Sequence, residues 1–272
     1  MLYTTSLNSG SNGNCYYIGN GQEAVLIDAG LSCRETEKRM LRLGLEMRKL
    51  KAIFISHEHS DHIKGVEILA KKYDLPVFVS DTTYQHSGIK LPQNQVRSLH
   101  TGIPVHIGSL LVKSFLKLHD AVDPHSFIIC YKGISIGVFT DIGRCCNALG
   151  SHFAECHAAY LEANYDTEML ENGHYPFYLK QRIRGGQGHL SNAESLEVFL
   201  KHKSSFLSHL FLSHLSKENN CPNKARNLFE EHAGKTRIII ASRYEETELY
   251  AISAADIFRP VLKRPVQMDL WG

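Results

Sequence analysis

One segment, KAIFISHEHSDHIKG at residues 51–65, constrains the fold of this chain more than any other. Its apolar residues 52–55 predict a buried strand that ends at Ser56. Three imidazoles and one carboxylate then follow within six positions: His57, His59, Asp61 and His62. A core strand that ends in so many cation-binding groups indicates a metal site at the edge of a sheet.

Four other apolar segments end in, or just before, a further Asp or His. These predicted strands cover residues 24–28, 114–118, 134–140 and 210–213, and the polar residues at their ends are Asp28, His119, Asp141 and His214. Side chains that collect at the carboxyl ends of strands form the usual site of an α/β protein. We therefore expect all of these groups to meet at one rim.

The spacing within the first segment predicts two neighbouring cations. His57 and His59 are two residues apart on extended chain, so both rings point to the same side and His119 can complete their site. Asp61 and His62 begin the next helix and would bind a second cation together with His214.

Asp141 can bridge the two cations, and Asp28 is better placed as an acceptor that fixes a histidine tautomer. Such a pair lowers the pKa of a water molecule enough to supply hydroxide at neutral pH. The ligand set favours zinc, with manganese as the alternative.

The remaining pattern is that of an α+β protein in which two mixed sheets pack face to face with helices outside. Capping signatures at Ser32 and Ser191, and Pro222 at a helix start, predict helices over residues 34–45, 191–203 and 223–234. Apolar periodicity predicts another helix over 62–73. We expect residues 265–271, PVQMDLW, to pair at a sheet edge.

Composition excludes several classes of protein. The chain has 43 % hydrophobic residues, which is ordinary for a globular protein, and its formal charge of +2 argues neither for nor against a nucleic-acid partner. Its seven cysteines include no CxxC pair, so we expect free thiols. The N-terminus has no secretory pattern and there is no run of 18 apolar residues, so we expect a cytoplasmic protein that does not enter a membrane.

The segment HEHSDH fits HxHxDH, and with later segments it resembles the metallo-β-lactamase fold superfamily. Its WalJ/YycJ-like branch, close to RNase Z-type nucleases, is the best match. The supporting segments are GSNGNCYYIG, HEHSDHIKG, LHDAVDPHSF, TDIG, LEANYD, GHLSN and LSHLSKENN. The resemblance implies a four-layer αββα sandwich with a dinuclear site at one edge.

Two relatives within that superfamily fit less well. Flavodiiron proteins usually have Glu at the position of His59, which disfavours a di-iron redox role. RNase J-type enzymes carry an inserted domain between the aspartate and the last histidine, whereas residues 142–213 leave no room for one here. We expect residues 1–272 to form one domain.

The resemblance also implies a general acid. In RNase Z-like enzymes a histidine in a short motif pairs with a glutamate and protonates the leaving oxygen, and His189 and Glu162 resemble that pair. An imidazole held by a carboxylate suits a phosphodiester, whose alkoxide leaves poorly. We expect catalysis to depend on His189, Glu162 and Asp61.

A basic and aromatic segment precedes His189. Residues 174–189 read as a mobile loop in which Tyr175, Phe177 and Tyr178 are followed by three cations and then by three glycines. Such a mixture can bind a single strand, although a plain solvated loop remains an alternative. The expected substrate-binding residues are Lys180, Arg182, Arg184 and Lys217.

The sequence thus predicts a cytoplasmic metal-dependent hydrolase that acts on nucleic acid as a 5′-exonuclease, with no obligate protein partner. A hydrolase of small esters, thioesters or lactones on the same fold is the first alternative. A nucleic-acid-binding module with structural metals is the second, and a mononuclear iron oxygenase using His57, His59, His119 and Asp141 is the third.

Overall fold

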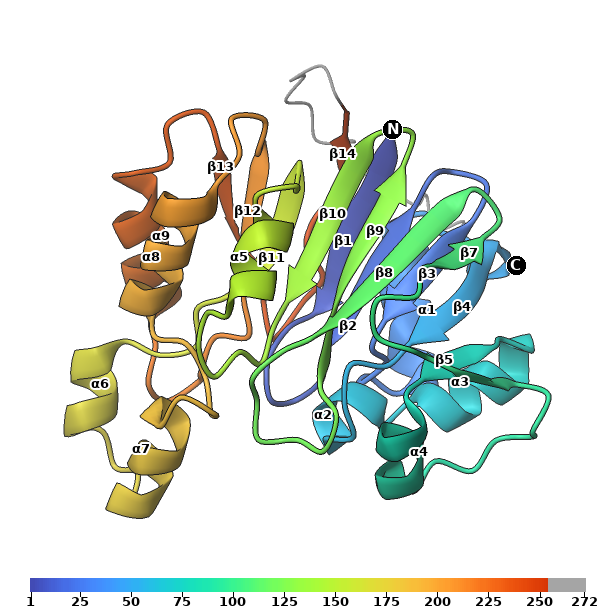
Figure 1. Cartoon of the computed structure of the whole chain (residues 1–272), viewed down its shortest axis with the longest axis horizontal. Helices are drawn as coiled ribbons and strands as arrows, with labels where there is room; N and C mark the ends of the chain where they lie inside the picture. Colours follow the sequence, from blue (N-terminus) through green and yellow to red (C-terminus); the bar gives the residue numbers. More distant parts are fainter. Residues whose placement is uncertain (254–272) are drawn as a thin grey trace, which may run out of the picture.

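The computed structural model describes residues 1–253, and within them two seven-stranded mixed sheets face each other (Figure 1). The first sheet has the order β14 (Tyr250–Ile252), β1 (Leu2–Asn8), β2 (Cys15–Gly19), β3 (Ala24–Ile27), β4 (Leu50–Phe54), β5 (Val77–Val79) and β6 (Val96–Ser98). The second has the order β13 (Arg237–Ile240), β12 (His209–Ser213), β11 (Ala158–Glu162), β10 (Ile134–Phe139), β9 (His125–Tyr131), β8 (Leu110–Leu116) and β7 (Val105–Ile107). The expected strand over residues 265–271 lies outside the described residues.

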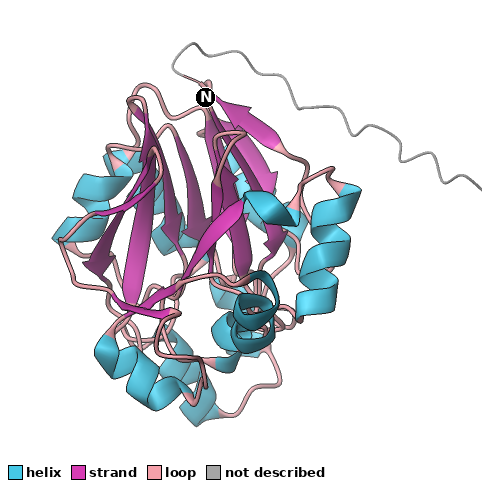
Figure 2. Ribbon diagram, turned by 90° about the vertical axis from the view of Figure 1, so that its right-hand side faces the viewer, coloured by secondary structure: helices cyan, strands magenta, loops and turns pink. Residues whose placement is uncertain are grey.

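Helices cover the outer faces of both sheets, as Figure 2 shows. Beside the first sheet lie α1 (Cys33–Arg42), the 3₁₀ turn η1 (Met47–Lys49), α2 (Ser60–Ile63), α3 (Val66–Tyr73) and α4 (Asp81–Ser87). The second half of the chain adds α5 (Asn147–Phe153), α6 (Thr167–Asn172), α7 (Phe177–Arg184), α8 (Asn192–His202) and α9 (Pro222–Glu230). The predicted arrangement of two mixed sheets with outer helices is confirmed.

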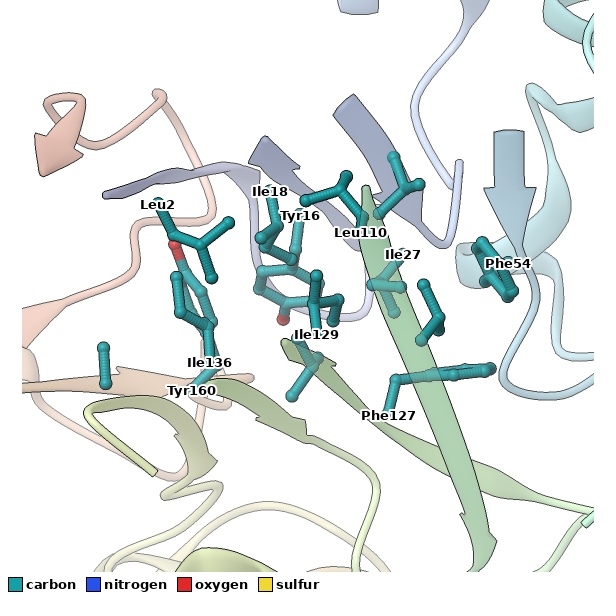
Figure 3. Packing of buried hydrophobic residues seen from close by; sticks show 14 of the residues in the cluster. Leu2, Tyr16, Ile18, Ile27, Phe54, Leu110, Phe127, Ile129, Ile136 and Tyr160 are labelled. Atoms are coloured by element: carbon teal, nitrogen blue, oxygen red, sulfur yellow. The ribbon is translucent and has the colours of Figure 1, made fainter. Parts of the chain in front are cut away.

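Three apolar layers hold this arrangement together. Between the sheets, Tyr16 of β2 packs on Tyr160 of β11 with ring centroids 4.8 Å apart, as the close view of this layer illustrates (Figure 3). The Tyr160 hydroxyl lies 2.9 Å from the Thr4 hydroxyl, so its polar end is satisfied in the core. One further cluster lies between the first sheet and its helices, and another between the second sheet and its helices. The strand faces are therefore buried on both sides, which explains their continuous apolar runs.

The predicted helix starts are confirmed where side chains cap them. Ser32 accepts a hydrogen bond from the Glu35 amide, and Ser191 and Glu194 form a complete capping box at the start of α8. Pro222 occupies the first turn of α9. These local signals hold because capping depends on residues only three positions apart.

The single helix predicted over residues 62–73 is wrong, because the structure divides it into α2 and α3. The break is at Gly65, whose amide donates to the Ala29 carbonyl at 2.8 Å. A Cβ atom there would lie 1.8 Å from the Leu31 carbonyl oxygen. Close packing against an earlier loop thus overrides the helical periodicity.

The loop predicted over residues 174–189 is also corrected, because it contains helix α7. Pro176 is its N-cap and Gly185 its C-cap, and most residues between them (Leu, Lys, Gln and two Arg) are good helix formers. The sequence analysis also missed β1, which pairs with β2 and β14. All seven cysteines are unpaired, as expected, and no helix within residues 1–253 is long and apolar enough to cross a membrane.

Candidate metal centre

Four turns that follow strands within the described residues have a left-handed backbone at a residue other than glycine. One is Lys132 in the hairpin after β9, and the other three are Asp28 after β3, Asp141 after β10 and His214 after β12, with φ of 60°, 56° and 57°. This conformation is unfavourable for residues with a Cβ atom and is typical of functional sites. The last three are residues that the sequence placed at the rim.

The first predicted ligand set is brought together. One ligand atom from each of His57, His59 and His119 lies within 4.8 Å of the others. His57 Nε2 and His59 Nδ1 are 3.1 Å apart, and the rings of His57 and His119 have centroids 4.9 Å apart. Three imidazole nitrogens facing one point can hold a transition-metal ion.

The second predicted set also converges. Asp61, His62 and His214 offer ligand atoms within 4.8 Å of one another. Asp61 Oδ2 lies 3.5 Å from His62 Nε2 and 3.7 Å from His214 Nε2. One carboxylate and two imidazoles thus surround a second point.

Asp141 lies between the two sets. Its Oδ2 is 3.2 Å from His62 Nε2, and its Oδ1 is 3.9 Å from His119 Nε2. One carboxylate therefore reaches one histidine of each set, which is the arrangement that a bridging ligand requires.

Unpaired buried atoms test whether this cluster fits cations. His119 Nε2, His214 Nε2 and Asp141 Oδ2 are buried and have no hydrogen-bond partner among the described residues. Leaving such groups unpaired is costly, so three together indicate partners of another kind. Because the free atoms are imidazole nitrogens and a carboxylate oxygen, the residues fit a pair of divalent cations.

The opposite nitrogen of each buried ligand ring has an acceptor. His62 Nδ1 lies 2.7 Å from Asp28 Oδ2, and His57 Nδ1 lies 2.8 Å from the Ser56 hydroxyl. His119 Nδ1 is 3.0 Å from the Gly188 carbonyl oxygen. A partner at Nδ1 fixes the ring and leaves Nε2 for the cation. Asp28 has the geometry expected of an acceptor that fixes the tautomer of a histidine, here His62.

The histidine rings of the site differ in charge: His57 and His119 are neutral, whereas His62 is cationic. Burial lowers the pKa of His119 to about 4 and holds that of His57 well below its usual value. Burial would also lower the pKa of His62, but the carboxylates of Asp141, Asp28 and Asp61 raise it to about 10. A site whose carboxylates draw protons onto imidazole attracts positive charge, and divalent cations supply it.

His189 and Glu162 form the predicted pair at the edge of this cluster. Glu162 is fully buried at the end of β11, and its Oε1 lies 2.9 Å from His189 Nδ1. Burial would raise the pKa of Glu162, but the imidazoles of His189 and His214 lower it to about 2. Its Oε2 accepts from the amides of Ile142 and Leu190, so the carboxylate is fixed.

A cleft of about 230 Å³ opens beside these residues. Its walls include the rings of His189 and His214, Tyr175 before α7, and Arg182 on α7. Asp120 also faces it, pairs with Arg182 at 2.5 Å, and lies 3.4 Å from His119 Nε2. The cleft therefore joins the candidate ligands to a cationic and aromatic surface.

The other predicted substrate-binding residues lie apart from this cleft. Lys180 donates to the Glu171 carbonyl oxygen, and Arg184 pairs with the Glu171 carboxylate. Lys217 lies 3.4 Å from Glu218 and lines a neighbouring pocket. Of the four predicted cations, Arg182 alone lines the cleft among the described residues.

Sequence reasoning missed Asn14. Its side-chain amide lies 3.1 Å from Asp61 Oδ2 and 3.0 Å from His62 Nε2, and its backbone amide donates to the Asp61 carbonyl at 2.7 Å. The available signal was the segment GSNGN, residues 10–14, which lies within one of the segments that carry the family resemblance. A Cβ atom on Gly30 would lie 1.7 Å from the same carbonyl, which shows how closely the loops approach.

Comparison with known proteins identifies the family. The model of the metallo-beta-lactamase superfamily matches residues 9–125. Exodeoxyribonuclease YycJ of Bacillus anthracis is 34 % identical over 228 residues, covering 83 % of this chain and 86 % of the relative. The chain belongs to the metallo-beta-lactamase superfamily.

Two further similarities agree with this metallo-beta-lactamase assignment. Exodeoxyribonuclease WalJ of Streptococcus pneumoniae is 34 % identical over 220 residues, covering 79 % of this chain and 81 % of the relative, which confirms the predicted branch. The crystal structure of the metallo-beta-lactamase fold protein YhfI from Bacillus subtilis superposes with a TM-score of 0.69 at 16 % identity. It covers 90 % of this chain and 98 % of YhfI, and it confirms the fold.

Proposed function

We propose that this protein is a dinuclear metal-dependent phosphodiesterase that shortens nucleic acid from the 5′ end, with DNA as its substrate. The observation that carries this proposal is the contact between His189, which lines the cleft beside the candidate ligands, and the buried Glu162. Hydrolysis of a small ester or lactone needs no such acid, whereas departure of a nucleotide alkoxide does. The names of the WalJ and YycJ relatives support DNA.

The candidate ligands form two sets, one for each cation. His57, His59 and His119 would hold one cation, and Asp61, His62 and His214 the other, with Asp141 between them. When bound, the two cations lower the pKa of water and supply an attacking hydroxide near neutral pH. The donor set favours zinc, and manganese is the alternative.

The chain itself would provide the proton and the orientation. Because Glu162 holds His189 at Nδ1, the Nε2–H of His189 is the group that can protonate the leaving oxygen. The buried carboxylate stabilises the charged ring and prevents it from turning. Arg182 would bind a phosphate at the mouth of the cleft once Asp120 releases it.

The proposal also includes the domain organisation, the location in the cell and the remaining basic residues. We expect residues 1–272 to act as one domain in the cytoplasm. Lys180, Arg184 and Lys217 would contact a longer substrate only at its periphery, because their present partners lie outside the cleft.

The test is an assay with end-labelled substrates. Metal-loaded protein is incubated with single- and double-stranded DNA and RNA, labelled at either end, and with a lactone and a thioester in parallel. We expect a 5′-labelled DNA strand to release short labelled products at once, while a 3′-labelled strand shortens stepwise. Turnover of the lactone or thioester without cleavage of nucleic acid would contradict the proposal.

A further inference from the structure

A second pocket lies directly behind the segment that carries the last histidine ligand. It has a volume of about 310 Å³, and Leu215 and Ser216 line both this pocket and the cleft. The two hollows are thus separated by one stretch of chain. A nucleic-acid strand whose scissile bond lies in the cleft could place a neighbouring nucleotide in the second pocket.

The charge of this pocket is predominantly positive. Lys217, Arg226 and Arg243 line it, whereas Glu245 is the carboxylate among its lining residues. Arg226 comes from α9 and Arg243 from the chain after β13, so the cations converge from separate elements. Three cations against one carboxylate favour an anionic ligand.

Two arginines of this pocket each have one guanidinium nitrogen without a partner among the described residues. Arg226 Nε and Arg243 Nη1 are buried atoms without a hydrogen-bond partner among the described residues. A buried charged donor left unpaired is unfavourable, and guanidinium donors match the oxygens of a phosphate group. Their positions at one pocket indicate the chemistry of the missing acceptor.

The N-terminal loop holds Arg243 in place. Asn12 donates to the Arg243 carbonyl at 2.8 Å, and Arg243 Nη2 donates to the Ser11 hydroxyl at 3.2 Å. A Cβ atom on Gly10 would lie 3.2 Å from Arg243 Cβ, so the loop packs closely around this residue. Ser11 also lines the cleft, which links the pocket to the reaction site from the other side.

We propose that Arg226 and Arg243 form a binding site for a phosphate group of the nucleic-acid strand, adjacent to the cleft. The inference rests on the proposed function, because it assigns part of the substrate to this pocket. The phosphate is either the 5′-terminal monophosphate or a backbone phosphate.

Binding measured without turnover tests this site independently of catalysis. In a His189→Ala background, fluorescence anisotropy compares 3′-labelled single-stranded DNA with a 5′-phosphate or a 5′-hydroxyl. We expect Arg243→Gln to weaken binding about tenfold and to lower the salt slope by about one. Arg226→Gln provides a second variant should Arg243→Gln fail to fold. Arg97→Gln removes an equal charge at the exposed strand β6 and should leave affinity unchanged.

The two sources of the phosphate give different results. Weakening confined to the 5′-phosphorylated strand assigns the terminal monophosphate, and equal weakening of both strands assigns a backbone phosphate. Affinity and salt slope unchanged in both variants, or no binding of DNA by the background protein, would overturn the proposal. Binding that responds to Arg243 without any cleavage by the wild-type enzyme would instead refute only the proposed function.

Discussion

Glu162 Oε1 lies 2.9 Å from His189 Nδ1, at the point where β11 ends. The same oxygen lies 2.9 Å from His214 Nδ1. One buried carboxylate therefore holds both the candidate acid and a candidate metal ligand. The proton donor and the cations keep a fixed spacing because they share this anchor.

Replacement of His189 should abolish turnover only where the leaving group needs a proton. We expect His189→Ala to lower kcat on DNA about 10²–10⁴-fold with little change in metal content. With bis(p-nitrophenyl) phosphate, whose phenolate leaves unaided, the loss should be small. His86→Ala, an exposed histidine on α4, is the matched control. Equal losses on both substrates would show that His189 is not the acid.

Replacement of Glu162 should disturb both of its partners. Glu162→Gln keeps the size of the side chain but removes the negative charge beside His189 and His214, so we expect lower kcat on DNA and metal affinity reduced about 10–100-fold. Asp28→Asn is the comparison, because Asp28 contacts His62 and is not a partner of His189. It should lower metal affinity while the ratio of DNA to bis(p-nitrophenyl) phosphate turnover stays unchanged. Metal competition titrations and parallel kinetics measure the two effects.

The ion pair of Glu246 with Arg42 should make stability depend on pH. Burial would raise the pKa of Glu246, but the hydrogen bond from Arg42 lowers it below its usual value. Because the folded-state pKa is lowered, the stabilisation is complete above the unfolded value of about 4.3 and is lost as the pH falls through the folded value. Arg42 is 41 % exposed, so we expect only about 1 kcal/mol.

Urea unfolding of Glu246→Gln checks this dependence. The variant should be less stable than the wild type at pH 7, and the difference should shrink below about pH 4. Glu248→Gln, an exposed neighbour, should show neither effect. A difference that is the same at both pH values would rule out the ion pair as its cause.

Gly65 should tolerate no side chain. Since a Cβ atom would lie 1.8 Å from the Leu31 carbonyl oxygen, Gly65→Ala should destabilise the fold by at least about 3 kcal/mol. Gly44→Ala meets no atom within 4 Å and carries only the penalty of its left-handed backbone, about 1 kcal/mol. Thermal unfolding of the two variants measures the contrast. Similar melting temperatures would contradict the close approach of Gly65 to the Leu31 carbonyl.

The sequence was sufficient for features that depend on neighbouring residues. Most strands were found because apolar runs mark them, whereas β1, with the sequence LYTTSLN, has no such run and was missed. The start of α8 was found because Ser191 and Glu194 are three positions apart. The candidate ligands could also be located from the sequence, because they follow apolar strands and the structure brings them together at one sheet edge. Their number is unusual enough to stand out from ordinary surface histidines.

The features that the sequence analysis missed depend on distant parts of the chain. The helix break at Gly65 is caused by a carbonyl of Leu31, 34 positions earlier. Asn14 contacts Asp61, which lies 47 positions later in the chain. Arg182 differs from Lys180 and Arg184 only in the direction in which α7 presents its side chain. No local pattern contains that information.

The candidate ligands come from both halves of the sandwich. His57, His59, Asp61 and His62 follow β4 of the first sheet, whereas His119, Asp141 and His214 follow β8, β10 and β12 of the second. Neither half carries all of the candidate ligands, so tight binding of two cations would require the two halves to be docked. Metal binding would then depend on complete folding, and a chain whose two halves have not docked would be an inactive nuclease.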